Sequence, residues 1–175
     1  MNNVYIHPTA NVSNLCKIGS GTSIWVNSQV IENAIIGLNC KIGKDTFIDH
    51  DVCIGNGVKI QNGVSVYYGI TIEDDVFVGP NVTFTNDYYP RSFNTEWKVS
   101  KTIIKKGASI GANSTIICGH SLGEYCMIGA GSVVTKDIPS YALVMGNPAK
   151  VVGHVCKCGE KLINGKCNKC NFELV

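Results

Sequence analysis

The chain lacks long apolar runs and carries little charge. No uninterrupted apolar segment of its 175 residues approaches the roughly 20 that a membrane-spanning helix needs, so we expect no span. Charged residues make up 16% of the chain and the formal net charge is +2. Such a balance does not favour binding to nucleic acid or to a membrane surface. The start, Met-Asn-Asn-Val-Tyr-Ile, lacks the basic and apolar regions of a signal peptide, so we expect a cytoplasmic protein.

The usual secondary-structure periods are also missing. Apolar residues follow neither the 3.6-residue spacing of an amphipathic helix nor the strict alternation of a half-buried strand. A large apolar residue instead recurs at every sixth position. The first series is Ile6, Val12, Ile18, Ile24, Val30, Ile36, Ile42, Ile48, Ile54, Ile60, Val66, Ile72, Val78 and Phe84; the second, two residues out of register, is Ile104, Ile110, Ile116, Leu122, Ile128 and Val134.

An even period in extended chain directs every marked side chain to one side, which predicts a β-solenoid whose coils stack these residues inside. The fourth residue after each marked one is small or medium, as Ala34 and Cys40 are. A glycine or polar residue often follows the marked position directly, as Gly37 and Gly43 do. We expect these glycines to provide the turns at the corners. A β-sandwich with fortuitous spacing is the alternative.

The repeat resembles that of the hexapeptide-repeat acyltransferases. Ile18-Gly-Ser-Gly-Thr-Ser, Ile42-Gly-Lys-Asp-Thr-Phe and Ile128-Gly-Ala-Gly-Ser-Val match its pattern, and the resemblance covers roughly residues 4 to 152. It implies an all-β fold, a left-handed parallel β-helix with three strands per coil. It also implies a homotrimer with sites between subunits.

One insertion interrupts the repeat. Phe84 and Ile104 are twenty positions apart, which is not a multiple of six, and residues 85–103 between them mix aromatic and polar side chains. Interruptions of a regular scaffold often carry function, so we expect a binding loop here rather than a purely structural excursion.

Three stretches resemble a narrower branch. They are residues 58–67, 73–92 and 128–150, the second reading Glu-Asp-Asp-Val-Phe-Val-Gly-Pro-Asn-Val-Thr-Phe-Thr-Asn-Asp-Tyr-Tyr-Pro-Arg-Ser. The resemblance implies an acetyl-CoA-dependent N-acetyltransferase that acts on the 3-amino group of a UDP- or dTDP-linked amino sugar. The product would serve the biosynthesis of surface polysaccharide or glycoprotein.

The sequence offers two sets of catalytic candidates. No Ser-His-Asp or Cys-His pattern is evident, so we favour direct attack of the amine on the thioester. Asn86 and Asp87 fall at the register break, where an amide can bind the oxyanion and a carboxylate can orient the amine. The branch implies that the coenzyme sulfur takes the final proton. His50, between Asp49 and Asp51, is the rival base, as in a related branch that acetylates 4-amino sugars.

Substrate contacts follow the layout that the resemblance implies. Expected contacts of the nucleotide sugar are Lys59, Gln61, Asn62 and Arg91. Expected contacts of acetyl-CoA are Ala112, Ala130, Gly131, Lys136 and Lys150.

The nine cysteines divide into three groups, one of which is Cys53 and Cys118 at variable positions of the repeat. Cys16, Cys40 and Cys126 occupy the small interior position of the repeat and act as small apolar residues. The last four form two pairs in residues 154–175, which predicts a zinc-ribbon-like appendage to a solenoid domain of residues 1–153. We expect structural zinc there, with disulfides or free thiols as alternatives. The expected ligands are Cys156, Cys158, Cys167 and Cys170.

Two other functions suit the same scaffold. A γ-type carbonic anhydrase needs three histidine ligands from adjacent coils, but only His50 and His120 lie within the coils. His120 also occupies a repeat position at which a small residue or valine is expected. A non-catalytic scaffold is the other alternative, and the polar, aromatic loop argues against it.

Overall fold

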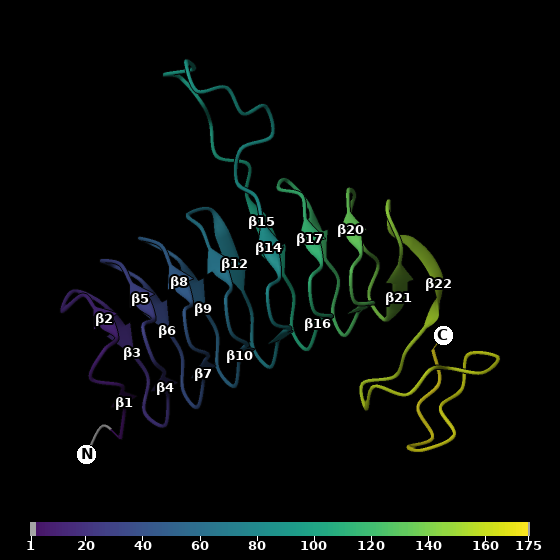
Figure 1. Ribbon diagram of the computed structural model, residues 1–175. Coiled ribbons are helices and arrows are strands. Elements are labelled where there is room, and N and C mark those ends of the chain that lie inside the picture. The colour runs from purple at the N-terminus through teal and green to yellow at the C-terminus, as the bar shows by residue number, and fades with distance from the viewer. Residues whose placement is uncertain (1–2, 175) are drawn as a thin grey trace.

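The computed structural model describes residues 3–174 and shows a β-solenoid (Figure 1). Short strands stack coil upon coil in three sheets, which we call sheets A, B and C. No helix is present in residues 3–174, and accordingly none could span a membrane. The prediction of an all-β solenoid is confirmed.

The strands repeat in the order A, B, C along the chain. Sheet A contains β1 (Tyr5–Ile6), β4 (Ser23–Ile24), β7 (Lys41–Ile42), β10 (Lys59–Ile60), β13 (Phe77–Val78), β16 (Ser109–Ile110), β19 (Met127–Ile128), β21 (Ala142–Met145) and β22 (Lys150–His154). Sheet B contains β2 (Asn11–Val12), β5 (Gln29–Val30), β8 (Phe47–Ile48), β11 (Ser65–Val66), β14 (Thr83–Phe84), β17 (Thr115–Ile116) and β20 (Val133–Val134). Sheet C contains β3 (Lys17–Ile18), β6 (Ile35–Ile36), β9 (Cys53–Ile54), β12 (Ile70–Ile72), β15 (Thr102–Ile104) and β18 (Ser121–Leu122).

The core consists of ladders of identical repeat positions. Strands pair in parallel with the strand one coil away, so that Ile24 lies against Ile42 and Ile42 against Ile60. All three side chains are at most 1% exposed. The small position fills the space between them, as Ala34 and Cys40 do, both fully buried. The first coil is the exception, because Ile6 is 43% exposed where no further coil covers it.

The corners correct one expectation. The left-handed backbone falls on the third residue after each marked one, where Asn39 and Asp51 have φ values of 56° and 55°. The glycine directly after the marked residue has another reason. A Cβ on Gly37 would lie 2.6 Å from the backbone of Gly55 in the next coil. These glycines therefore permit the close approach of stacked coils rather than the turn.

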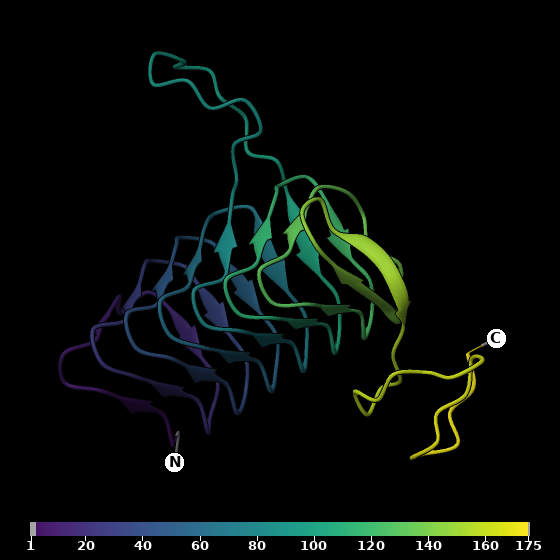
Figure 2. The same ribbon diagram turned by 45° about the vertical axis from the view of Figure 1, so that its right-hand side comes forward.

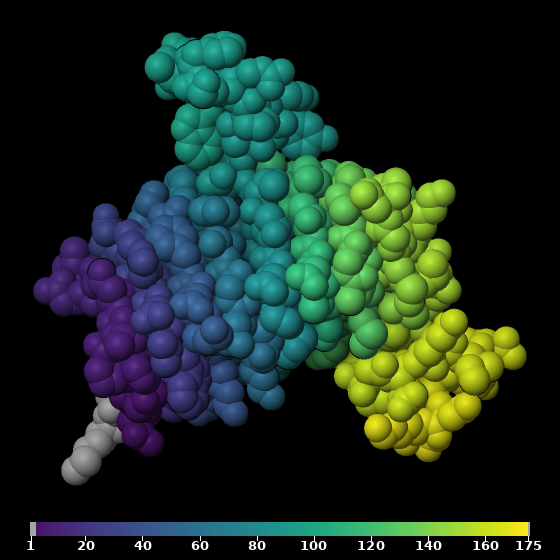
Figure 3. Space-filling view, viewed as in Figure 1, coloured from purple at the N-terminus to yellow at the C-terminus, as the bar shows by residue number. Residues whose placement is uncertain are grey.

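The insertion after Phe84 is a loop of residues 85–101 that stands off the solenoid (Figures 2 and 3). The register recovers at once, because Ile104 pairs with Ile72 in sheet C. A hydrogen bond from the Ser100 N–H to the Asn86 carbonyl, 3.0 Å long, closes the base of the loop. The inserted loop was predicted as residues 85–103, and the strand resumes slightly earlier, at Thr102.

The solenoid ends with a reversal of direction. β22 pairs antiparallel with β21 and is the last strand of sheet A. Beyond it, residues 155–174 form a small unit with isolated β-bridges and the four terminal cysteines.

The two isoleucines of β6 predict a contrast in stability. Ile36 is 2% exposed and Ile35, its neighbour on the outer face, is 43% exposed. Ile36→Ala leaves a cavity in the ladder and should lower the free energy of unfolding by about 2–5 kcal/mol. Ile35→Ala should change it by about 0.5 kcal/mol or less. Guanidinium titration followed by circular dichroism measures both, and equal losses would contradict the assigned strand orientation.

Candidate functional site

One corner brings together two of the predicted catalytic candidates and a tyrosine between them. His50, Tyr68 and Asn86 occupy the same repeat position on successive coils at the corner between sheets B and C, which we call the B–C corner. The His50 and Tyr68 rings stack with centroids 4.6 Å apart, and the Asn86 side-chain amide lies 3.5 Å from the Tyr68 carbonyl oxygen. The structure thus places His50 in one row with Asn86, as the spacing of two coils indicated.

His50 lies among acidic groups. Its Nδ1 is 2.8 Å from an Asp51 carboxylate oxygen, and the side chain is 43% exposed. The hydrogen bond to Asp51 raises the pKa of His50 above its ordinary value, with further contributions from the charges of Asp49, Asp51 and Glu32. The raised pKa favours the protonated imidazole, which donates hydrogen bonds, over the neutral form that a general base requires.

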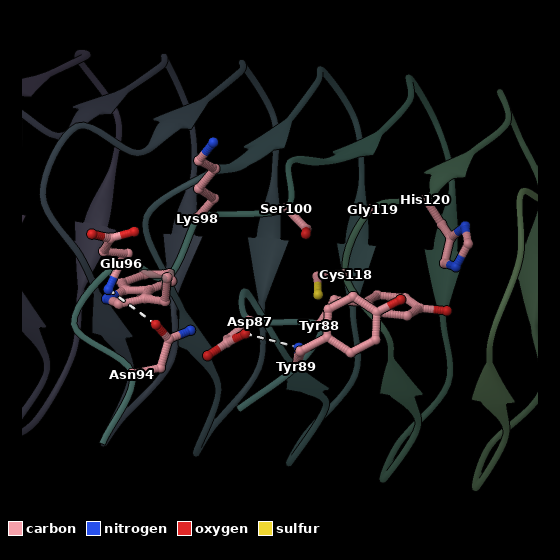
Figure 4. Close-up of a pocket in the computed structure, with 11 residues that line it drawn as sticks. Asp87, Tyr88, Tyr89, Asn94, Glu96, Lys98, Ser100, Cys118, Gly119 and His120 are labelled. Atoms are coloured by element: carbon pink, nitrogen blue, oxygen red, sulfur yellow. Dashed lines mark hydrogen bonds between the residues drawn. The ribbon is translucent and has the colours of Figure 1, made fainter. Parts of the chain in front are cut away.

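The loop and the next coil enclose a hollow of about 670 Å³ (Figure 4). Asp87 lies at its edge, and its carboxylate accepts a hydrogen bond of 2.9 Å from the Tyr89 N–H. Tyr88 and Tyr89 line the hollow from the loop, and Cys118 lines it from the solenoid. Asn86 borders a second, adjoining hollow of about 380 Å³ together with Asp87. An amide, a carboxylate and aromatic rings therefore line two adjoining hollows that share Asp87, which suits a polar ring-shaped ligand.

His120 lines the larger hollow as well, and no role was assigned to it from the sequence. Its Nδ1 is 3.6 Å from an Asp137 carboxylate oxygen, and its Nε2 is buried without a hydrogen-bond partner among the described residues. A buried polar atom of this kind costs free energy unless a ligand or water meets it. The sequence contained one sign of a special role for His120, since it is a large residue at the small position of the repeat.

The four residues predicted to contact the nucleotide sugar do not come together in one chain. Lys59 is exposed on the outer face of sheet A, and Gln61 and Asn62 follow it toward the corner between sheets A and B, the A–B corner. The Asn62 side-chain oxygen already accepts a hydrogen bond of 3.0 Å from the Lys44 N–H. Arg91 lies in the loop, exposed, with its guanidinium 2.8 Å from the Pro90 carbonyl oxygen.

The predicted acetyl-CoA residues are also divided. Ala112, Ala130 and Gly131 lie at the A–B corner, and Gly131 has φ +70° with open space where a Cβ would stand. Ala130 borders an apolar groove of about 430 Å³ on the outer face of sheet A. Lys150 begins β22 opposite Met145, which lines the same groove, whereas Lys136 lies apart at the B–C corner.

The two halves of the expected chemistry therefore occupy different corners of one chain. Asn86 and Asp87 follow sheet B, whereas Ala112 and Ala130 follow sheet A, and a strand of sheet B separates the two corners in every coil. Direct transfer requires the amine and the thioester to be in contact. A single chain thus presents the two expected subsites apart.

The four C-terminal cysteines form a compact cluster, with all Sγ atoms within 4.8 Å of one another. The Sγ–Sγ distances are 3.1 Å for Cys156–Cys170, 3.5 Å for Cys158–Cys167, 3.7 Å for Cys158–Cys170 and 3.5 Å for Cys167–Cys170. Tetrahedral zinc with Zn–S bonds of 2.3 Å places sulfurs about 3.8 Å apart, so the cluster fits this ion closely. The Lys169 N–H, 3.4 Å from Cys167 Sγ, lowers the pKa of that thiol to about 7 and so favours the thiolate.

Comparison with known proteins identifies the scaffold. The model of the bacterial transferase hexapeptide (six repeats) matches residues 51–86, and that of the hexapeptide repeat of succinyl-transferase matches residues 33–68 and 101–136. A dTDP-3-amino-3,6-dideoxy-alpha-D-galactopyranose 3-N-acetyltransferase from Aneurinibacillus thermoaerophilus is 52% identical over 158 residues. The match covers 90% of this chain and 82% of the relative.

Solved structures share the fold at lower identity. A hexapeptide transferase family protein from Anaplasma phagocytophilum has a TM-score of 0.61 at 20% identity, with 87% of this chain and 80% of that one covered. The acetyltransferase domain of PglB from Neisseria gonorrhoeae, in complex with acetyl coenzyme A, has a TM-score of 0.57 at 22% identity. There the match covers 86% of this chain and 58% of the other.

With this solenoid, the loop-borne hollow and such a relative, the chain belongs to the hexapeptide-repeat transferases. Its place within that family is the branch of nucleotide-sugar N-acetyltransferases.

The contact between His50 and Asp51 predicts a titration shift. Asp51→Asn keeps a residue that accepts the left-handed backbone, as Asn33 does one coil earlier, but removes the charge. The pKa of His50 should fall toward its ordinary value of 6.5. The contribution of the pair to stability is complete below pH 6.5 and is lost as the pH rises through the raised folded-state pKa. NMR titration of the imidazole measures the shift, and an unchanged pKa would show that Asp51 is not its cause.

Proposed function

We propose that the protein transfers an acetyl group from acetyl-CoA to the 3-amino group of a dTDP-linked amino sugar. The observation that carries the proposal is the relative with this activity in its name, 52% identical over 90% of the chain. A UDP-linked sugar is the variant with the same chemistry. The product would be an N-acetylated sugar for a surface glycan.

The hollow at the loop base supplies the groups that the transfer needs. The Asp87 carboxylate accepts a hydrogen bond from the amine and directs its lone pair at the thioester carbon. The Asn86 amide stabilises the oxyanion as the tetrahedral intermediate forms. The amine displaces the coenzyme thiolate, and the proton that the amine loses passes to that sulfur. No acyl-enzyme is needed. His120 Nε2, buried beside the hollow, binds a sugar hydroxyl.

The separation of the corners supports a site shared between two copies. In this proposal the A–B corner of one subunit brings Ala112, Ala130 and Gly131, with acetyl-CoA, to the B–C corner of a neighbour. Lys59, Gln61 and Asn62 would then face Arg91 from the other subunit and hold the diphosphate and the base. Lys136 and Lys150 would meet the phosphates of the coenzyme. We further propose that the β-helix is left-handed and that three copies of the chain form a homotrimer.

The terminal cysteines form the second part of the proposal. Residues 154–175 are a unit separate from the solenoid of residues 1–153, and its four thiolates hold one zinc ion in a structural role. We also propose that the reaction takes place in the cytoplasm, and the lack of any disulfide among the nine cysteines supports a reducing compartment.

Acetylation of a 4-amino sugar with His50 as base is the second candidate. The observation that favours it is the row of His50, Tyr68 and Asn86, which brings an imidazole close to the loop base. A γ-type carbonic anhydrase receives no such support. Within residues 3–174, the four cysteines are the only cluster of three or more metal-ligating side chains, and none of them is a histidine. A non-catalytic scaffold leaves the two hollows without a role.

The proposal predicts the substrate and the residues that matter. Incubation with acetyl-CoA and a dTDP-linked 3-amino-3,6-dideoxyhexose should release free thiol, followed with a chromogenic disulfide. Asp87→Asn and Asn86→Ala should each lower kcat by about 100-fold, because they remove groups that act on the reacting atoms.

The control is Asp75→Asn, which removes a carboxylate at the corner between sheets C and A. The backbone of Asp75 is left-handed, a conformation that asparagine also accepts. Asp75→Asn should leave kcat unchanged. One pair of results would replace the first candidate with the second. No 3-amino sugar would cause thiol release, whereas a 4-amino sugar would, and His50→Asn would abolish that release.

The metal site makes a prediction that is independent of activity. The purified protein should contain about one zinc per chain by elemental analysis, and Cys170→Ser should lose most of it. Cys53→Ser changes an exposed cysteine of the solenoid and is the matched control. Equal zinc content in the two variants, or none in the wild type, would exclude the assigned ligands.

A further inference from the structure

Two tyrosines occupy a backbone conformation that suits neither of them. At the corner between sheets C and A, the left-handed position is filled in successive coils by glycine, asparagine or aspartate, but by Tyr125 and Tyr141 in the last two. Their φ values are 54° and 62°. Every other residue with a left-handed backbone in residues 3–174 is Gly, Asn or Asp. A bulky side chain is disfavoured there, so its presence requires a compensating contact.

The compensating contact is the terminal cysteine unit. The Tyr125 and Tyr141 rings stack at 5.5 Å with an interplanar angle of 13°, and Phe172 packs on Tyr141 at 5.2 Å. The Lys157 ammonium lies 5.2 Å from the centre of the Tyr125 ring. Gly107, one coil earlier, leaves room for the Tyr125 ring, which a Cβ there would strike. The rings thus form a continuous column from the solenoid into the unit.

The unit depends on its metal ligands to present Phe172. Its buried core is only Cys156, Leu162 and Cys167, with Phe172 and Leu174 packed against it. So few buried side chains cannot order a chain of this length, and four thiolates on one ion can. Phe172 follows Cys170 by two residues, so the metal site positions the ring that contacts Tyr141.

The same coils form the apolar groove. Met127 lines it, and the turn at Gly159 of the cysteine unit faces the methyl end of Met127, 3.9 Å from a Cβ built on that glycine. Leu143 and Met145, also in the groove, belong to β21, which pairs with β22 directly before the cysteines. A change in the docking of the unit therefore reaches the wall of the groove.

We propose that the cysteine unit is a metal-dependent brace, which docks on the Tyr125–Tyr141 column and holds the last two coils and their apolar groove in shape. Metal loss would free Phe172, leave two strained tyrosines uncompensated and loosen β21 and β22. The proposal rests on the zinc site proposed above. Ala130, a proposed contact of acetyl-CoA, borders this groove, so metal loss would also raise the KM for that substrate.

The test compares Tyr141→Asn with Tyr141→Phe in the full-length zinc-loaded protein. Asparagine suits the left-handed corner, as Asn39 does at the same corner, but removes the ring. Relief of the backbone strain opposes the loss of the stack on Tyr125, so without a brace the net change in stability would be small. A brace predicts retained zinc, a thermal midpoint lower by about 2–4 °C, and amide exchange in residues 138–155 faster by about fivefold. Tyr141→Phe keeps the ring and should match the wild type in all three.

Metal removal supplies the second arm. Chelation, or Cys170→Ser, should speed exchange in residues 138–155 and leave the early coils, such as residues 35–48, unchanged. The brace would be excluded if Tyr141→Asn had the thermal midpoint and the amide exchange rates of the wild type. It would also be excluded if amide exchange in residues 138–155 stayed slow after chelation. Zinc content, thermal midpoint and amide exchange are measured without catalysis. The brace can therefore be tested even if the protein does not catalyse the proposed acetyl transfer. In an active enzyme, an unchanged KM for acetyl-CoA after chelation would remove the link to the groove.

Discussion

The structure depends on parallel stacking in register, at a separation of 18 residues in the coils before the insertion. Each strand residue meets its counterparts one coil before and one coil after, so a substitution affects mainly these two neighbours. The ladders that bury Ile24, Ile42 and Ile60 follow from this, and so do the rows of polar and aromatic residues at the corners. The geometry of the candidate site is a consequence of the same stacking, because His50, Tyr68 and Asn86 form one row.

The insertion is possible because stacking does not require the corners to be short. Only the strands need to meet their partners, and Ile104 regains Ile72 after seventeen loop residues, 85–101, have left the wall. The loop is held at its base by the bond between Ser100 and Asn86 and packs little against the solenoid elsewhere, since Tyr89 and Phe93 are 76% and 81% exposed. Exposed aromatic rings are typical of surfaces that bind a ligand or another chain, and Tyr89 also lines the larger hollow.

The period predicted the strands, the core and the position of the loop, because each follows from a side-chain pattern that a single coil must satisfy. It could not predict which residue takes the turn. Gly37 and Asp51 both suit a corner from sequence alone, and only the approach of Gly55 shows that Gly37 serves stacking instead. His120 was noticed as an oversized residue at a small position. Its relation to Asp87 depends on how far the loop leans over the next coil, which no local pattern contains.

The strained tyrosines show that departures from a regular repeat mark the positions of additional contacts. Repetition sets an expectation for every position, so a departure is visible without any second sequence. At most corners the left-handed residue is one that bears the conformation at little cost, and nothing needs explaining. Tyr125 and Tyr141 bear it at a cost, and both rings lie in the column that meets the cysteine unit. The strain coincides with this contact in two successive coils, so the contact explains it better than chance does. Tyr125 and Tyr141, and not the cysteines alone, therefore connect the proposed metal site to the solenoid.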